Sequence, residues 1–156
     1  MLTKRTRAEN QFFITSTIVE GTEITNKIGD ALVSRIVQAH DEGTEWRAVI
    51  VIPLVPGYTF PIDHESAGSV RMIMNCQNMS ISHGENSIFA RLRREGINPD
   101  DYITFYSLRG CGKFTSTGAL TTEAVYIHAK TFVADDRLVI IGSANVSRIF
   151  FDCHSR

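Results

Sequence analysis

The stretch YIHAKTFVADDRLVIIGSAN, residues 126–145, decides the predicted fold of this chain. Residues 125–133 are rich in β-branched and aromatic types, and the Asp135-Asp136 pair that follows favours a turn. A second apolar run starts at residues 138–143. Two such runs around a short polar pair predict a β-hairpin.

Side chains alternate between the two faces of a strand, so this hairpin predicts which of them meet. His128 and Lys130 are two residues apart and are expected to share a face. Ser143 and Asn145 have the same spacing just after the returning strand, and Gly142 lets the backbone approach a ligand. An imidazole, an ammonium, a hydroxyl and an amide are therefore predicted to converge on a small anion.

The full spacing is H-x-K-x4-D-x6-G-S-x-N, which arises by chance on the order of a few times per million chains of this length. These residue types suit a tetrahedral phosphate. A neutral His128 can attack phosphorus and form a covalent phosphohistidine. Lys130 would stabilise the charge on the non-bridging oxygens, to which Ser143 and Asn145 would donate hydrogen bonds. No metal or other cofactor is required by this chemistry.

Residues 126–145 resemble the second HKD motif of the phospholipase D superfamily, and two further stretches narrow the resemblance to the eukaryotic type. Residues 9–14 (ENQFFI) resemble the segment that lies between the two motifs of that family, and residues 84–88 (GENSI) resemble another stretch before the second motif. The resemblance covers residues 9–147, and the whole chain, residues 1–156, is predicted to be a single domain with divergent or truncated ends.

The resemblance implies an α/β fold with a mixed β-sheet flanked by helices, one lobe of a two-lobed catalytic fold. It makes His128 the motif histidine, Lys130 its phosphate-binding lysine, and Ser143 and Asn145 accessory phosphate contacts. Asp135 is the motif aspartate, which either acts at the substrate or braces the hairpin turn. The implied reaction is hydrolysis of phosphatidylcholine-like lipids to phosphatidic acid and a head-group alcohol.

The chain departs from the family pattern because it carries one HKD motif instead of two. The other histidines lack a lysine two residues on; they are His40, His64, His83 and His154. The resemblance ends after Ser147, and Asp152 does not match the carboxylate that usually orients the motif histidine. Three hypotheses follow: one catalytic half whose mate is an upstream segment or another chain, a homodimeric one-motif phosphodiesterase or nuclease, or an inactive fragment.

Composition limits the partners. The chain of 156 residues has 43% hydrophobic residues, enough for one core, and its net charge of −1 gives no attraction to nucleic acid. Three cysteines without a C-x-x-C pair favour a reducing, cytoplasmic setting and indicate no zinc site. No apolar run approaches the roughly eighteen residues of a membrane span, so contact with lipid is expected to be peripheral.

Apolar spacing and turn residues predict the remaining elements. Glu9, Asn10 and Gln11 either line the site or form a polar strand end, and His83 either approaches the site or lies on an exposed loop. The elements expected before the hairpin are a strand over 12–19, a helix over 28–39, a strand over 46–52, a helix over 87–95, a strand over 102–108 and a loop over 109–122.

Overall fold

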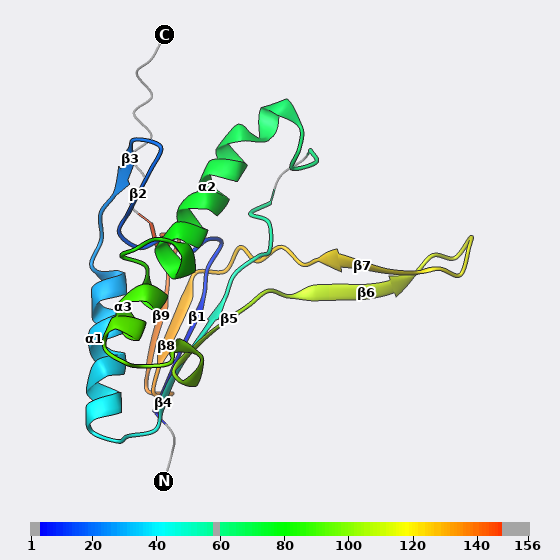
Figure 1. Cartoon of the computed structure of the whole chain (residues 1–156). Coiled ribbons are helices and arrows are strands. Elements are labelled where there is room, and N and C mark those ends of the chain that lie inside the picture. The colour runs from blue at the N-terminus through cyan, green and yellow to red at the C-terminus, as the bar shows by residue number, and fades with distance from the viewer. Residues whose placement is uncertain (1–3, 58–59, 148–156) are drawn as a thin grey trace.

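The computed structural model describes residues 4–57 and 60–147, and its centre is a mixed five-stranded sheet (Figure 1). The strand order is β5-β4-β1-β8-β9, with β1, β4 and β5 parallel to one another and with antiparallel pairing of β1 with β8 and of β8 with β9. The mixed α/β fold predicted from the sequence is confirmed. The strands are β1 (Lys4–Glu9), β4 (Trp46–Val51), β5 (Ile103–Tyr106), β8 (Thr131–Ala134) and β9 (Leu138–Ile141).

Helices and two separate ribbons complete the described part of the chain. The ribbon β6–β7 projects away from the sheet (Figure 1). The helices are α1 (Ile28–Asp41), α2 (Gly68–Asn78) and α3 (Ile88–Arg94), with the short turns η1 (Glu65–Ala67), η2 (Met79–His83, a π-turn) and η3 (Pro99–Asp101). The ribbons pair β2 (Thr17–Val19) with β3 (Thr22–Ile24), and β6 (Arg109–Lys113) with β7 (Leu120–Ala124).

One face of the sheet carries the main hydrophobic core. Along β4 the side chains of Trp46, Ala48 and Ile50 are buried, while those between them are not. These residues pack with Ile36 of α1 and Leu92 of α3, both fully buried. On the opposite face, no described strand residue of this sheet is buried. The sheet is therefore covered by helices on one side within residues 4–57 and 60–147.

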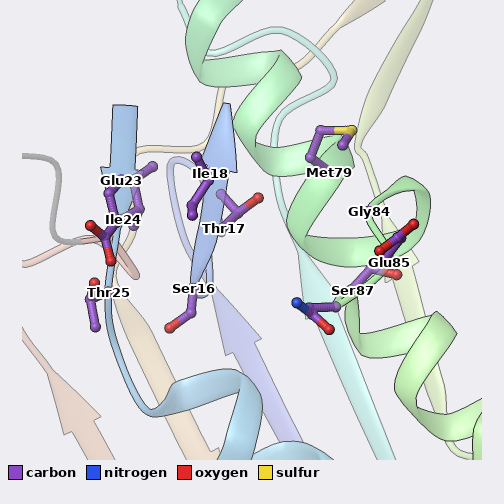
Figure 2. Close-up of a pocket in the computed structure, with 11 residues that line it drawn as sticks. Ser16, Thr17, Ile18, Glu23, Ile24, Thr25, Met79, Gly84, Glu85 and Ser87 are labelled. Carbon is purple, nitrogen blue, oxygen red and sulfur yellow. The ribbon is translucent and has the colours of Figure 1, made fainter. Parts of the chain in front are cut away.

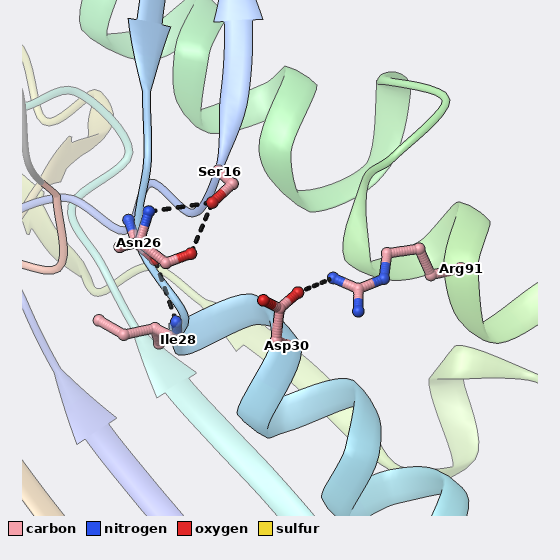
Figure 3. A network of polar contacts seen from close by, with 5 residues as sticks. All are labelled: Ser16, Asn26, Ile28, Asp30 and Arg91. Atoms are coloured by element: carbon pink, nitrogen blue, oxygen red, sulfur yellow. Dashed lines mark hydrogen bonds and ion pairs between the residues drawn. The ribbon is translucent and has the colours of Figure 1, made fainter.

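Polar contacts hold the start of α1 (Figure 3). The Oδ1 atom of Asn26 accepts a hydrogen bond from the backbone N–H of Ile28 at 3.1 Å, which satisfies a free donor of the first turn. The Nδ2 atom of Asn26 donates to the carbonyl of Ile14 at 3.0 Å. Arg91 of α3 pairs with Asp30 of α1 at 2.7 Å, a half-exposed ion pair worth at most about 1 kcal/mol.

The segment after β1 is fastened to the helical layer by two buried side chains. The Oε1 atom of Gln77 accepts a hydrogen bond from the backbone N–H of Phe13 at 2.9 Å. The hydroxyl of Ser80 accepts one from the backbone N–H of Thr15 at 3.2 Å. Both acceptors lie near the junction of α2 and η2, so this junction fixes the path of residues 10–15.

Replacement of Gln77 with leucine is expected to lower the free energy of unfolding by about 1–3 kcal/mol, because it leaves the buried N–H of Phe13 without a partner. Denaturant unfolding followed by circular dichroism measures the change. The matched control is Gln38→Leu on the exposed side of α1, where a change within about 0.5 kcal/mol is expected. Equal effects of the two substitutions would contradict the role given to Gln77.

The structure confirms several predicted elements and corrects others. The helices over 28–39 and 87–95 and the strands over 46–52 and 102–108 are present with small shifts of their ends. Two corrections concern the N-terminal region and the predicted loop. The strand expected over 12–19 is wrong for residues 12–16 and covers Thr17–Val19 alone, while Lys4–Glu9 forms the central strand. The loop expected over 109–122 is the β6–β7 ribbon.

The hairpin of residues 126–145 is present, but its first strand is shorter than predicted. Residues 125–133 were expected to be extended throughout, and the strand β8 begins only at Thr131. His128 and Lys130 therefore precede the regular strand, and the alternation of faces does not apply to them. The prediction failed there because β1 offers pairing partners to residues 131–134 and its register ends at Glu9.

Candidate active site

Four of the five predicted site residues, all except Asp135, lie at one edge of the sheet. Parallel β1 and β4 end there at Glu9 and Val51, and antiparallel β8 starts there, with Thr131 paired to Glu9. Strand β9 also ends there, because Ile141 pairs with Thr131. The segments that follow β1 and β9 run side by side, joined by a bridge between Phe13 and Val146. In open α/β sheets this carboxyl edge is the usual place for a ligand.

Lys130 lies at the centre of this edge. The residue is 9% exposed, and its Nζ atom donates hydrogen bonds to the Oε1 atom of Gln11 at 3.2 Å and to the carbonyl oxygen of His128 at 2.8 Å. A nearly buried ammonium is stable only when polar groups replace its hydration. Lys130 is thus a fixed positive charge held against the backbone of the motif histidine.

His128 is exposed, and its ring lies beside the ring of Tyr126 with centroids 5.9 Å apart. Within the part of the chain that the structure describes, no side chain hydrogen-bonds the His128 imidazole. Tyr126 itself packs closely on Gly57, where an added Cβ would lie 2.7 Å from the tyrosine ring. The glycine after β4 therefore leaves room for the residue that flanks His128.

Asn145 contacts the same glutamine as Lys130. Its Nδ2 atom donates to the Oε1 atom of Gln11 at 3.3 Å, whereas its Oδ1 atom is buried and has no partner among the described residues. The backbone N–H of Val146 donates to the Oδ1 atom of Asn10 at 3.3 Å. Ser143 is exposed on the segment between β9 and Asn145. The structure thus brings Lys130 and Asn145 together through residues 10 and 11.

Asp135 does not lie at this edge. It follows β8 at the other end of the hairpin, five residues or roughly 16 Å of strand from Lys130. Asp135 and Asp136 have φ angles of 51° and 54°, the left-handed values of a tight hairpin turn, and the N–H of Asp135 donates to the carbonyl of Arg5 at 2.8 Å. Of the two roles predicted for Asp135, this position favours bracing of the hairpin.

Curated relatives agree with the motif resemblance. A phospholipase D1 of Schizosaccharomyces pombe is 52% identical over 139 residues, which cover 89% of this chain and 10% of the relative. The phospholipase D1 of Saccharomyces cerevisiae is 53% identical over 139 residues, and that of Homo sapiens is 41% identical over 140 residues. This chain belongs to the eukaryotic phospholipase D family. No family model matches it.

The match concerns only a part of the phospholipase D relatives. The chain spans about a tenth of their length, from 8% for the Saccharomyces cerevisiae protein to 13% for the human one. Among the described residues, no helix is long and apolar enough to span a membrane, and no group of three or more acidic, histidine or cysteine side chains is arranged to hold a metal ion.

The GENSI stretch, residues 84–88, contributes to a pocket that the motif hairpin does not line. Ser87 caps α3 by accepting a hydrogen bond from the N–H of Ala90 at 3.1 Å, and Gly84 packs so closely that an added Cβ would meet the carbonyl oxygen of Met79 at 2.5 Å. Residues 84–87 line a pocket of about 350 Å³ together with the β2–β3 ribbon (Figure 2). No residue of 126–145 lines this pocket.

The other described histidines are engaged elsewhere. The Nδ1 atom of His83 lies 2.8 Å from the hydroxyl of Ser82 at the exposed end of the π-turn, so the loop interpretation of His83 is the one its position favours. The Nδ1 atom of His64 accepts from the N–H of Ser66. His154 and Asp152 lie outside the described residues. Among the described histidines, only His128 accepts a hydrogen bond from Lys130, through its backbone carbonyl.

Cys76 of α2 is buried, and its thiol is not among the groups that contact Lys130 or Asn145. Burial, helped by the negative charge of Glu20, raises the pKa of the Cys76 thiol. A raised pKa leaves less of the nucleophilic thiolate at a given pH. Cys111 in β6 is exposed.

We therefore expect iodoacetamide at about pH 8 to alkylate Cys111 at least about tenfold faster than Cys76 in the folded chain. Peptide mass spectrometry measures both rates in one sample. In denaturant the two rates should become similar, which serves as the control. Equal rates in the folded chain would mean that Cys76 is not protected by burial.

Proposed function

We propose that this chain provides one catalytic half of a phospholipase D, which hydrolyses phosphatidylcholine-like phospholipids to phosphatidic acid and a head-group alcohol. The observation that carries the proposal is the ammonium of Lys130, a buried residue, which is held against the backbone of His128 by a hydrogen bond of 2.8 Å. The identity of 52% to a phospholipase D1 supports the lipid substrate.

The proposed chemistry has two displacement steps. A ring nitrogen of His128 attacks phosphorus, forming an N–P bond while the bond from phosphorus to the head-group oxygen breaks. The leaving alkoxide takes a proton from a second histidine. Water, which gives a proton to this second histidine, then attacks the phosphohistidine; an O–P bond forms, the N–P bond breaks, and phosphatidic acid is released. Lys130, Ser143 and Asn145 stabilise the non-bridging oxygens in both steps.

The second histidine belongs to the partner half in this proposal, either an upstream segment or another chain. The lobe described above would then be one of two that face each other across the substrate. We also propose that the protein is cytoplasmic and contacts the membrane surface peripherally, and that nucleic acid is not a substrate, because the net charge of −1 offers no attraction to a phosphate backbone.

A phosphatidyl ester of p-nitrophenol tests the proposal on the chain as it exists. Its leaving group needs no proton, so the half site alone should complete the first step. We expect a burst of about one p-nitrophenolate per chain, accompanied by a phosphatidyl adduct that mass spectrometry places on His128. Absence of both burst and adduct would refute the catalytic role.

The same assay separates the homodimer hypothesis from the half-site hypothesis. A homodimer would carry two His128 side chains about a two-fold axis and would turn over an ordinary phosphatidylcholine. Continuous choline release by the purified chain, together with a dimer in light scattering, would replace the half-site proposal. A monomer that shows only the burst agrees with it.

A further inference from the structure

We propose that Gln11 is a positioning residue for the phosphate-binding groups of this site, an inference that rests on the proposed function. Its Oε1 atom accepts hydrogen bonds from both Lys130 Nζ, at 3.2 Å, and Asn145 Nδ2, at 3.3 Å. Gln11 comes from the segment after β1, more than a hundred residues away from both donors in the sequence. Gln11 thus links Lys130, which precedes β8, to Asn145, which follows β9.

The Lys130 ammonium decides how both amides are oriented. An ammonium can only donate, so the atom of Gln11 that faces Lys130 must be the carbonyl oxygen. That oxygen in turn requires a donor from Asn145, so the Nδ2 atom of Asn145 must face Gln11. The orientation of Asn145 therefore follows from Lys130 through Gln11, and it leaves the buried Oδ1 of Asn145 unpaired.

This arrangement leaves donors available for a phosphate. Lys130 has three N–H bonds, of which one reaches Gln11 and one the carbonyl of His128. Asn145 has two, of which one reaches Gln11. Counted over the described part of the chain, each side chain keeps one N–H for an oxygen of the substrate.

A glutamine does this without weakening the positive charge. A carboxylate at position 11 would make the same two contacts but would also neutralise the ammonium of Lys130. A neutral acceptor holds the ammonium in place and leaves its charge to act on the substrate phosphate. The amide of Gln11, as distinct from a carboxylate, is therefore matched to anion binding.

The first test measures how firmly Lys130 is held and needs no ligand. The folded chain is treated with a limiting acetylating reagent, and mass spectrometry compares acetylation of Lys130 with that of exposed Lys113. In Gln11→Met we expect Lys130 to react several-fold faster relative to Lys113 than in the unsubstituted chain. In Gln11→Glu it should stay slow. An unchanged rate in Gln11→Met would overturn the inference.

The second test measures affinity for tungstate, a phosphate mimic, by calorimetry. We expect Gln11→Met to weaken binding at least about tenfold, because the acceptor that orients the donors of Lys130 and Asn145 is lost. Gln11→Glu should weaken it by a similar factor although it keeps the contacts. The matched control Gln38→Met on α1 should bind as the unsubstituted chain does, and all variants should keep the same unfolding temperature within a few degrees.

A double-mutant cycle with Lys130→Met tests whether Gln11 affects tungstate affinity through Lys130. If Gln11 acts by holding Lys130, Gln11→Met should cause little further loss once Lys130 is replaced. Fully additive losses would overturn the inference. If the unsubstituted chain binds no tungstate, the proposed phosphate chemistry fails, and the acetylation rates still decide whether Gln11 holds Lys130.

Discussion

A chain in which alanine replaces His128 is expected to release p-nitrophenolate from the phosphatidyl ester at least about a thousandfold more slowly, because the attacking nitrogen is gone. The phosphatidyl adduct should be absent from its mass spectrum. The His128 side chain is exposed and has no hydrogen-bond partner among the described residues, so its removal should leave the unfolding temperature unchanged.

Two other histidines provide controls for this prediction. His64 and His83 are also exposed, and neither lies beside Lys130. His64→Ala and His83→Ala should give the full burst and an adduct on His128. An adduct that persists at full yield in His128→Ala would place the nucleophile elsewhere and would end the phosphohistidine proposal.

The motif hairpin could be predicted from the sequence because its signals are local. The β-branched run, the Asp135-Asp136 turn and the second apolar run act over neighbouring residues, and the structure has the turn at Asp135 and Asp136. The extent of the first strand could not be predicted in this way. It depends on pairing with β1, and the register ends where Glu9 meets Thr131.

Elements without a buried face escaped prediction for a related reason. Strands β6 and β7 pair with each other in a separate two-stranded sheet. All their residues are exposed except Thr121, which is half-buried, so no alternation of apolar and polar residues marks these strands. Their glycines and threonines are typical of loops. The central strand β1 was missed because polar Lys4, Arg5 and Arg7 interrupt its apolar pattern, and only Thr6 and Ala8 are buried.

The role of Gln11 had a partial signal in the sequence. The resemblance of residues 9–14 to a family segment indicated that Gln11 could line the site, but a polar strand end would look the same. Only the parallel order of β1 and β4 and the antiparallel β8 bring Gln11 to Lys130, across 119 positions of sequence. Contacts of that separation follow from topology and not from local pattern.

Replacement of Lys130 with methionine should have the second large effect. The burst rate is expected to fall about a hundredfold to a thousandfold, the usual cost of losing one donor that stabilises charge in the transition state. Tungstate binding should weaken at the same time and stay measurable at high tungstate concentration. Methionine has a similar length without charge, so it fills the space that the lysine side chain occupies.

The stability of this variant distinguishes a functional lysine from a structural one. Lys130 is a buried residue, so its ammonium loses most of its hydration in the folded chain. Its two hydrogen bonds replace that hydration only in part. We therefore expect Lys130→Met to unfold at the same denaturant concentration as the unsubstituted chain or a higher one. The control Lys113→Met, on the exposed β6 strand, should change neither burst nor stability.

A loss of stability in Lys130→Met that matched the loss of burst would mean that Lys130 supports the fold and that the activity falls because the edge is disordered. A large loss of burst with unchanged or increased stability has a different meaning. It would show that the chain keeps a charge in a nearly buried position that its fold does not require. The remaining use for that charge, which lies beside His128 and has one N–H without a partner among residues 4–57 and 60–147, is a bound phosphate.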